Sequence, residues 1–183
     1  MDLHLDFWGM NMDLLPSQIA ALNPLMVMLL IPINNWGVFP LFAKLGYPLS
    51  PLRKMTLGMF VASLAFVVVA LIQEAIDAGE ATGVKVHVVW QVLPYFLMTQ
   101  AEVMVSITGL EFAYTQAPKR MKSTIMGFWL LCVALGSKIV VIMTGFEELS
   151  LADFFWVFAG LMAVAGVLFG LRARVYRGKE YTQ

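Results

Sequence analysis

The fold class of this chain is decided by residues 55–73, which read MTLGMFVASLAFVVVALIQ. These 19 residues carry no charged side chain and lie between Lys54 and Glu74. A bilayer core about 30 Å thick is crossed by roughly 20 apolar residues of helix. The rest of the chain agrees, since 60% of its 183 residues are hydrophobic, 13% are charged and the mean hydropathy is +0.80. A soluble domain needs more charge on its surface, so the sequence predicts an integral membrane protein.

Apolar stretches of this kind recur along the chain and predict an all-α fold, a polytopic membrane helix bundle of about five transmembrane helices. The expected spans are residues 19–41, 55–76, 88–110, 123–144 and 152–172. The first opens at Asn23-Pro24 and is interrupted by Pro32 and Asn34-Asn35. We expect the amides of Asn34 and Asn35 to satisfy the helix backbone that the proline disturbs.

The charges between the spans predict an orientation. Basic residues favour the cytoplasmic ends of membrane helices. In a five-span topology, ten of the 12 basic residues lie on one side. They are Lys44, Arg53, Lys54, Lys119, Arg120, Lys122, Arg172, Arg174, Arg177 and Lys179. This distribution places the C-terminus in the cytoplasm and the N-terminus outside. An odd number of spans with an external start leads us to expect further spans upstream.

Several function classes are disfavoured by the composition. The 12 basic and 12 acidic residues give a net charge of zero, and no basic run with interleaved aromatics suggests nucleic acid as a partner. Cys132 is the only cysteine and lies in an apolar block, so we expect it to pack as a small hydrophobe. The sequence contains no catalytic constellation and no phosphate-binding glycine loop, which disfavours an enzyme or an ATP-driven pump.

Glu102 is the residue that most strongly suggests a function. It lies near the centre of the third span, where an ionised carboxylate costs several kcal/mol unless it faces protein or water. Tyr95, Thr99, Glu102, Ser106 and Gly109 follow one another at steps of four, three, four and three, which places them on one helix face. This polar face predicts the wall of a substrate cavity. The alternative is a contact between helices held by hydrogen bonds.

Two more residues are candidates for the same cavity. Asn23 can hydrogen-bond an amine or a carbonyl of a ligand, and its alternative role is to start a helix before Pro24. Trp129 in the fourth span is a candidate cavity aromatic, and a purely packing role is the alternative.

The sequence around Glu102 resembles the proton-coupled oligopeptide transporter (peptide transporter) family of the major facilitator superfamily. The segments that carry the resemblance are Gln100-Ala101-Glu102-Val103, residues 106–114 (SITGLEFAY), Gln116-Ala117-Pro118, Met121-Lys122-Ser123 and residues 127–131 (GFWLL). Residues 16–19, Leu22-Asn23-Pro24 and Ile31-Pro32 resemble the family more weakly. The resemblance implies that the chain is a C-terminal segment corresponding to helices eight to twelve of twelve. Residues Met1 to Leu15 are then expected to form the outer end of helix seven and its loop.

The resemblance also implies roles for individual residues. Glu102 stands where the family has a carboxylate that contacts the amino end of the peptide and takes part in gating. Asn23 matches a position beside the peptide amino group, and Ser106 and Trp129 match pocket-lining positions. Ser137 departs from the family, which commonly has Asn there.

Taken together, these observations predict a part of a symporter for di- and tripeptides in the cell membrane. Its coupling ion is expected to be the proton, with no cofactor. The family's proton-coupling residues and the basic partners of Glu102 belong to an N-terminal half that this sequence lacks. We therefore expect the chain not to transport alone. The alternative is a non-transporting truncated membrane protein or a scaffold that binds other helices.

Overall fold

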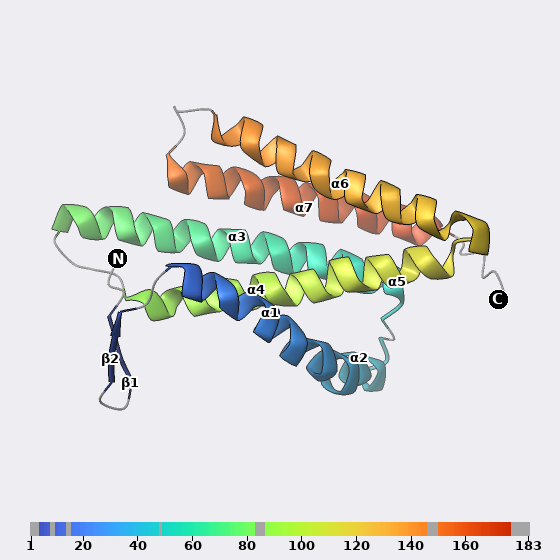
Figure 1. Cartoon of the computed structure of the whole chain (residues 1–183), viewed down its shortest axis with the longest axis horizontal. Coiled ribbons are helices and arrows are strands. Elements are labelled where there is room, and N and C mark those ends of the chain that lie inside the picture. The colour runs from blue at the N-terminus through green and yellow to red at the C-terminus, as the bar shows by residue number, and fades with distance from the viewer. Residues whose placement is uncertain are drawn as a thin grey trace.

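A computed structural model describes residues 4–7, 10–13, 16–47, 49–82, 87–145 and 150–176. Long helices make up most of this part of the chain, and they lie side by side with their axes nearly aligned (Figure 1). The predicted all-α membrane bundle is therefore confirmed as the fold class. Four helical runs among the described residues are long and apolar enough to cross a membrane: Asn23–Lys44, Pro51–Gly79, Lys122–Thr144 and Leu151–Val175.

A short β-hairpin precedes the helices and corrects the helical part of the expectation for Met1 to Leu15, whereas the expected loop is not contradicted; residues 1–3, 8–9 and 14–15 lie outside the described residues. Strand β1 (His4–Phe7) pairs antiparallel with β2 (Met10–Asp13), with His4 opposite Asp13 and Phe7 opposite Met10. These segments are therefore not the end of a membrane helix. The sequence of β1 explains the difference, because polar His4 and Asp6 alternate with apolar Leu5 and Phe7, which is the period of a strand.

The first helical run is longer than expected and contains a wide turn. It consists of α1 (Pro16–Ile33), the π-helical turn η1 (Asn34–Val38) and α2 (Phe39–Lys44). Pro32 and Pro40 flank η1, and each lacks the backbone N–H that a regular turn uses. Asn34 Nδ2 donates to the carbonyl oxygen of Leu30 at 2.8 Å, so its amide does satisfy helix backbone as predicted.

The third expected span also contains a π-helical turn. After a 3₁₀ turn η2 (Val88–Gln91), α4 (Val92–Glu102), η3 (Val103–Ile107) and α5 (Thr108–Thr115) form one continuous helical run. It is not among the four runs that length and composition identify as membrane spans. The reason is its polar content, since Thr99, Gln100 and Glu102 lower its hydropathy in the middle.

Helices α3 (Pro51–Thr82) and α7 (Leu151–Val175) make the most extensive contact of the bundle, and they run antiparallel (Figure 1). Glycines on α7 permit the approach: a Cβ on Gly170 would lie 3.0 Å from Thr56 Cγ2. Ser63 Oγ donates to the carbonyl oxygen of Ala159 at 2.8 Å. Small residues and hydrogen bonds of this kind hold helices together in lipid, where the hydrophobic effect does not.

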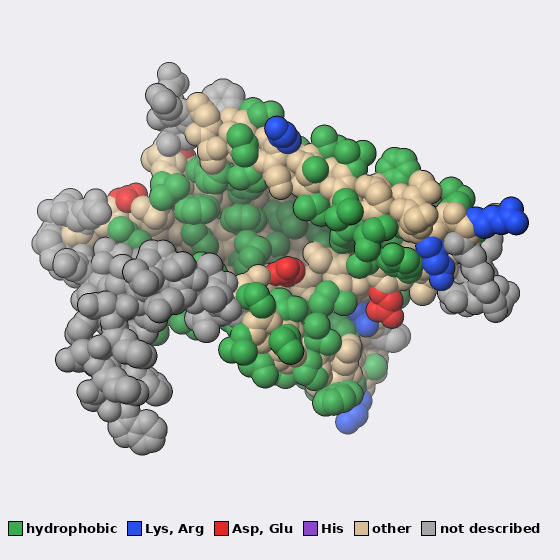
Figure 2. Space-filling model, in the orientation of Figure 1, with side chains coloured by type: hydrophobic (Ala, Val, Ile, Leu, Met, Phe, Trp, Pro, Cys, Tyr) green, Lys and Arg blue, Asp and Glu red, His purple; other side chains and the backbone are tan. Residues whose placement is uncertain are grey.

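The remaining long helix, α6 (Lys122–Thr144), follows the 3₁₀ turn η4 (Lys119–Met121) and has no buried residue. Large apolar side chains remain exposed along it, among them Phe128, Leu130 and Ile142. The face seen in Figure 2 is likewise mostly hydrophobic, and most of its basic side chains lie toward the end where the C-terminus is found. Such a surface fits a protein whose outer side contacts lipid or other helices.

Candidate functional site

The central polar contact of the bundle joins Asn23, Thr99 and Glu102. Asn23 Nδ2 donates to Glu102 Oε2 at 3.2 Å, and Thr99 Oγ1 lies 2.8 Å from Asn23 Oδ1. Thr99 and Glu102 stand three residues apart on α4, so both face α1. The structure thus brings together two of the predicted site residues, Asn23 and Glu102, which are 79 positions apart in the sequence.

The contact orients the amide of Asn23. Thr99 is 1% exposed and its hydroxyl also lies 2.8 Å from the carbonyl oxygen of Tyr95, so its single proton is directed to one of two oxygens. When it donates to Asn23 Oδ1, the opposite end of that amide presents its N–H groups to Glu102. Glu102 itself is exposed, so its carboxylate keeps lone pairs for a further donor. A carboxylate held in this way can accept a hydrogen bond from a cationic group.

The position of Asn23 differs from the expected helix start. Helix α1 begins at Pro16, so Asn23 and Pro24 lie inside it. The side chain of Asn23 is half-buried and bonded to α4, which leaves the helix-start role without support.

A second, more deeply buried polar contact joins η1 to α4, and the sequence did not predict it. Asn34 and Gln100 exchange two hydrogen bonds, Asn34 Nδ2 to Gln100 Oε1 at 3.0 Å and Gln100 Nε2 to Asn34 Oδ1 at 2.6 Å. Asn34 is fully buried and bonds Leu30 as well. The sequence does contain an indication of this contact. Asn34 follows Asn23 by 11 residues, about three helical turns, which predicts that both amides lie on the same helix face.

The other two predicted site residues lie farther along the bundle. Ser106 is half-buried within η3, whose wide turn breaks the regular spacing of the polar stripe. Trp129 of α6 packs on α5, where a Cβ added to Gly109 would lie 3.1 Å from Trp129 Cη2. Gly109 thus admits the indole ring of Trp129.

The chain matches known proteins over most of its length. Residues 2–177 match a family model described as the POT family. The chain is 34% identical to the peptide transporter PTR2 of Saccharomyces cerevisiae over an alignment 192 positions long. This alignment covers 98% of this chain and 30% of that protein. It is 45% identical to human solute carrier family 15 member 1 over 93 residues, covering 50% of this chain and 13% of that protein.

Solved structures agree with these matches. A crystal structure of an auto-inhibited POT family peptide transporter superposes with a TM-score of 0.78 at 41% identity, covering 95% of this chain and 36% of that one. The in meso crystal structure of the POT family transporter PepTSo gives a TM-score of 0.76 at 41% identity, covering 89% and 34%. The chain thus spans about a third or less of the length of these relatives. It is a multi-pass membrane protein, and it belongs to the POT family.

Proposed function

We propose that this chain is one part of a transporter for di- and tripeptides, and that the Asn23–Thr99–Glu102 contact is its share of the substrate site. The observation that carries the proposal is an exposed carboxylate in the middle of a helical bundle, held by an amide from a neighbouring helix. A charge in that position is costly and typically marks a pathway for a substrate or an ion. The names of the relatives, which are peptide transporters, supply the substrate class.

In this proposal Glu102 receives the amino group of the peptide. The ammonium group donates to the free lone pairs of the carboxylate, while Asn23 holds the carboxylate from its other side. Ser106 and Trp129 line the pathway one to two turns farther along. Their half-buried positions are compatible with a contact to a small ligand, which is the role the resemblance assigns to them.

The proposed transporter also needs a second part. Alternating access places a substrate site between two sets of helices that rock against each other. On this chain Glu102 faces outward from the described helices, so a facing set of helices must close the site and supply a cationic partner for Glu102. We propose that an N-terminal transporter half fills this place, that the proton is the coupling ion and that its coupling residues lie in that half.

The charge distribution supports an orientation for this part of the transporter. Lys44, Arg53 and Lys54 lie around the end of α2 and the start of α3, and Arg172 and Arg174 lie in the last turn of α7. Antiparallel packing of α3 and α7 brings these two groups to the same end of the bundle. We propose that this end faces the cytoplasm and that the chain's N-terminus lies outside. Arg177 and Lys179, used for the same prediction, lie outside the described residues.

A scaffold that binds other membrane helices is the second candidate. The complete lack of buried residues on α6 favours it, since this helix offers its apolar length to a partner. The two candidates differ in one property: a transporter part needs the charge of Glu102, whereas a helix-binding scaffold does not.

The test is uptake of a labelled dipeptide into cells that make this chain joined to an N-terminal half from a POT family transporter. With Glu102→Gln we expect proton-driven uptake to fall at least tenfold, because the neutral amide no longer pairs with the peptide amine. A loss of about 1.4 kcal/mol in the free energy of peptide binding gives that factor. Asp77→Asn, which removes an exposed carboxylate near the far end of α3, is the control and should keep uptake. Undiminished uptake with Glu102→Gln contradicts the proposal, and uptake by this chain alone contradicts the need for a second half.

A further inference from the structure

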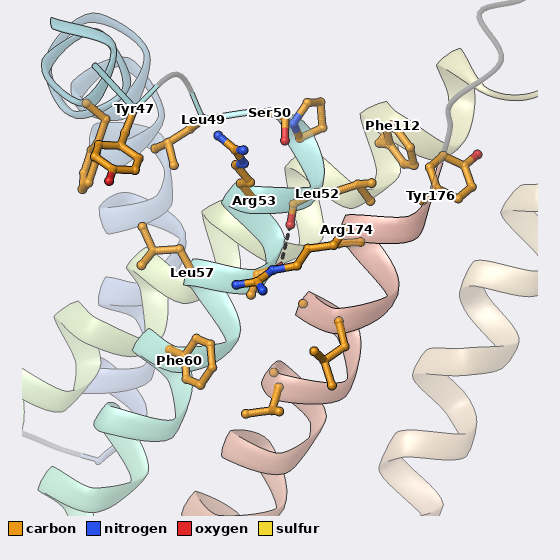
Figure 3. A pocket seen from close by; sticks show the side chains of 18 of the residues that line it. Tyr47, Leu49, Ser50, Leu52, Arg53, Leu57, Phe60, Phe112, Arg174 and Tyr176 are labelled. Atoms are coloured by element: carbon orange, nitrogen blue, oxygen red, sulfur yellow. Dashed lines mark hydrogen bonds between the residues drawn. The ribbon is translucent and has the colours of Figure 1, made fainter. Parts of the chain in front are cut away.

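A large cavity lies away from the Asn23–Thr99–Glu102 contact, between the start of α3 and the end of α7 (Figure 3). Its volume is about 1360 Å³, which exceeds the usual 300–1,000 Å³ of a site for a drug-sized ligand. The deeper part of its wall is apolar, with Leu57 and Phe60 from α3 and Val167 from α7. A long apolar group therefore fits between the two helices.

Two arginines, Arg53 of α3 and Arg174 of α7, line the mouth of this cavity. Figure 3 shows the Arg174 side chain extending from α7 across toward α3, and the Arg53 side chain extending from the start of α3 toward Leu49 and Ser50. None of the described residues that line the cavity is acidic. Guanidinium groups bind phosphate oxygens through two parallel hydrogen bonds, so paired arginines at the mouth suit a phosphate group.

Aromatic residues complete the mouth. Tyr47 and Tyr176 line it, and the ring of Tyr176 packs edge-on against Phe112 with centroids 5.8 Å apart. Tyrosine favours the boundary between lipid and water, where its ring is apolar and its hydroxyl is solvated. The arginines and tyrosines thus mark the headgroup level of a bilayer, and the apolar wall lies on the side of its hydrocarbon core.

The arginines also have a more general explanation. A cation near a helix C-terminus stabilises the helix through its dipole, and a long basic side chain extends to the membrane surface. That explanation requires neither a cavity nor two arginines from different helices lining the same one. Arg174 is turned toward α3 over the opening rather than away from the bundle (Figure 3).

We propose that this cavity, which we name the α3–α7 groove, binds an anionic phospholipid. The phosphate lies between Arg53 and Arg174, and an acyl chain follows the apolar wall toward Phe60. Basic pockets between membrane helices on the cytoplasmic side bind anionic headgroups, and this end of the bundle is the basic one. The site does not depend on peptide transport, so its test is separate from that of the proposed function.

The experiment measures lipids retained by the purified 183-residue chain in native mass spectrometry, with dioleoyl phosphatidylglycerol and dioleoyl phosphatidylcholine as probes. We expect the chain to retain phosphatidylglycerol in preference to phosphatidylcholine. Each arginine near a membrane surface contributes about fivefold in affinity, so Arg53→Gln with Arg174→Gln should lower phosphatidylglycerol affinity about 30-fold. Arg174→Lys, which keeps the charge and loses the planar guanidinium, should lower it less.

The control pair is Arg120→Gln with Lys122→Gln, which removes two charges outside the groove and should leave lipid retention unchanged. Val167→Trp fills the groove without changing charge and should reduce retention of both lipids. Helical circular dichroism of every variant verifies folding. The proposal is overturned if the arginine pair has no effect, if the control pair has the same effect, or if glycerol phosphate without acyl chains binds as tightly as the lipid.

Discussion

At the scale of single residues, the bundle is organised by amides that pair with groups on another helix. Asn23 reaches Glu102, and Asn34 reaches Gln100. Both pairs connect the α1–η1 run to α4, and Asn23 of α1 lies about three turns from Asn34 of η1. Two such contacts restrict sliding of one helix along the other, because a shift by one turn would break both. The carboxylate of Glu102 thereby keeps a defined position beside Asn23.

Thr99→Val tests the orientation of Asn23. The variant removes the hydroxyl at nearly constant volume, and we expect a loss of about 0.6 kcal/mol in bundle stability, the average for hydrogen bonds between membrane helices. In the joined transporter, peptide affinity should fall as well, because the Asn23 amide can then turn. Equilibrium unfolding in mixed micelles and peptide competition measure the two effects. Thr144→Val is the matched control, since the hydroxyl of that exposed threonine donates to the carbonyl oxygen of Val141 in its own helix.

The Asn34–Gln100 pair predicts that the stability losses of the two single variants do not add up in the double variant. Asn34→Leu or Gln100→Leu alone leaves a polar partner unsatisfied and should cost about 1–3 kcal/mol. Replacing both by Leu should cost less than the sum of the two, because no orphaned amide remains at this contact. A double-mutant cycle in unfolding free energy provides the measurement. Additive losses would mean that the two side chains do not depend on each other.

At the scale of helices, the absence of a side chain at certain glycines allows neighbouring elements to pack closely. A Cβ on Gly58 of α3 would lie 2.7 Å from Val105 Cγ2 and 2.8 Å from Met104 Cβ in η3. The π-helical turn and the glycine thus fit each other, and α3 packs against the run that carries Glu102. No comparable neighbour lies within 4 Å of a Cβ added to Gly160 on α7.

Gly58→Ala should therefore push η3 away from α3 at a cost of about 1–3 kcal/mol, as for other overpacked cores. Thermal unfolding in detergent detects the change as a lowered midpoint. Gly160→Ala, the same substitution in open space, should shift the midpoint little. Equal shifts for the two variants would contradict the close α3–η3 approach.

At the scale of the whole molecule, the described helices form a bundle with one basic end, polar contacts between helices in its middle and a largely apolar surface. The Asn23–Thr99–Glu102 contact and the α3–α7 groove are separate sites. One serves the proposed peptide pathway, and the other serves the surrounding lipid. Their separation means that substitutions in the groove should not change the Asn23–Glu102 contact.

Two serines at opposite ends of the molecule test its orientation. Ser50 precedes α3 at the basic end, and Ser150 precedes α7 at the other end; both are exposed. In a chain with Cys132→Ser, we expect a membrane-impermeant maleimide to label Ser150→Cys in intact cells and Ser50→Cys only after permeabilisation. The reverse pattern would place the N-terminus inside the cell and invert the proposed topology.

The sequence alone determined the membrane class and the helical character of the spans, and it singled out Glu102 as a candidate site residue. These properties follow from local composition, since a run such as residues 55–73 has few stable conformations outside a membrane helix. The partners of the polar residues required the tertiary structure. The amides of Asn23 and Asn34 can each bond their own helix or another one, and only the packing of the α1–η1 run on α4 selects Glu102 and Gln100 as their partners. The two π-helical turns and the α3–α7 groove likewise depend on contacts between distant segments, which hydrophobic periodicity does not encode.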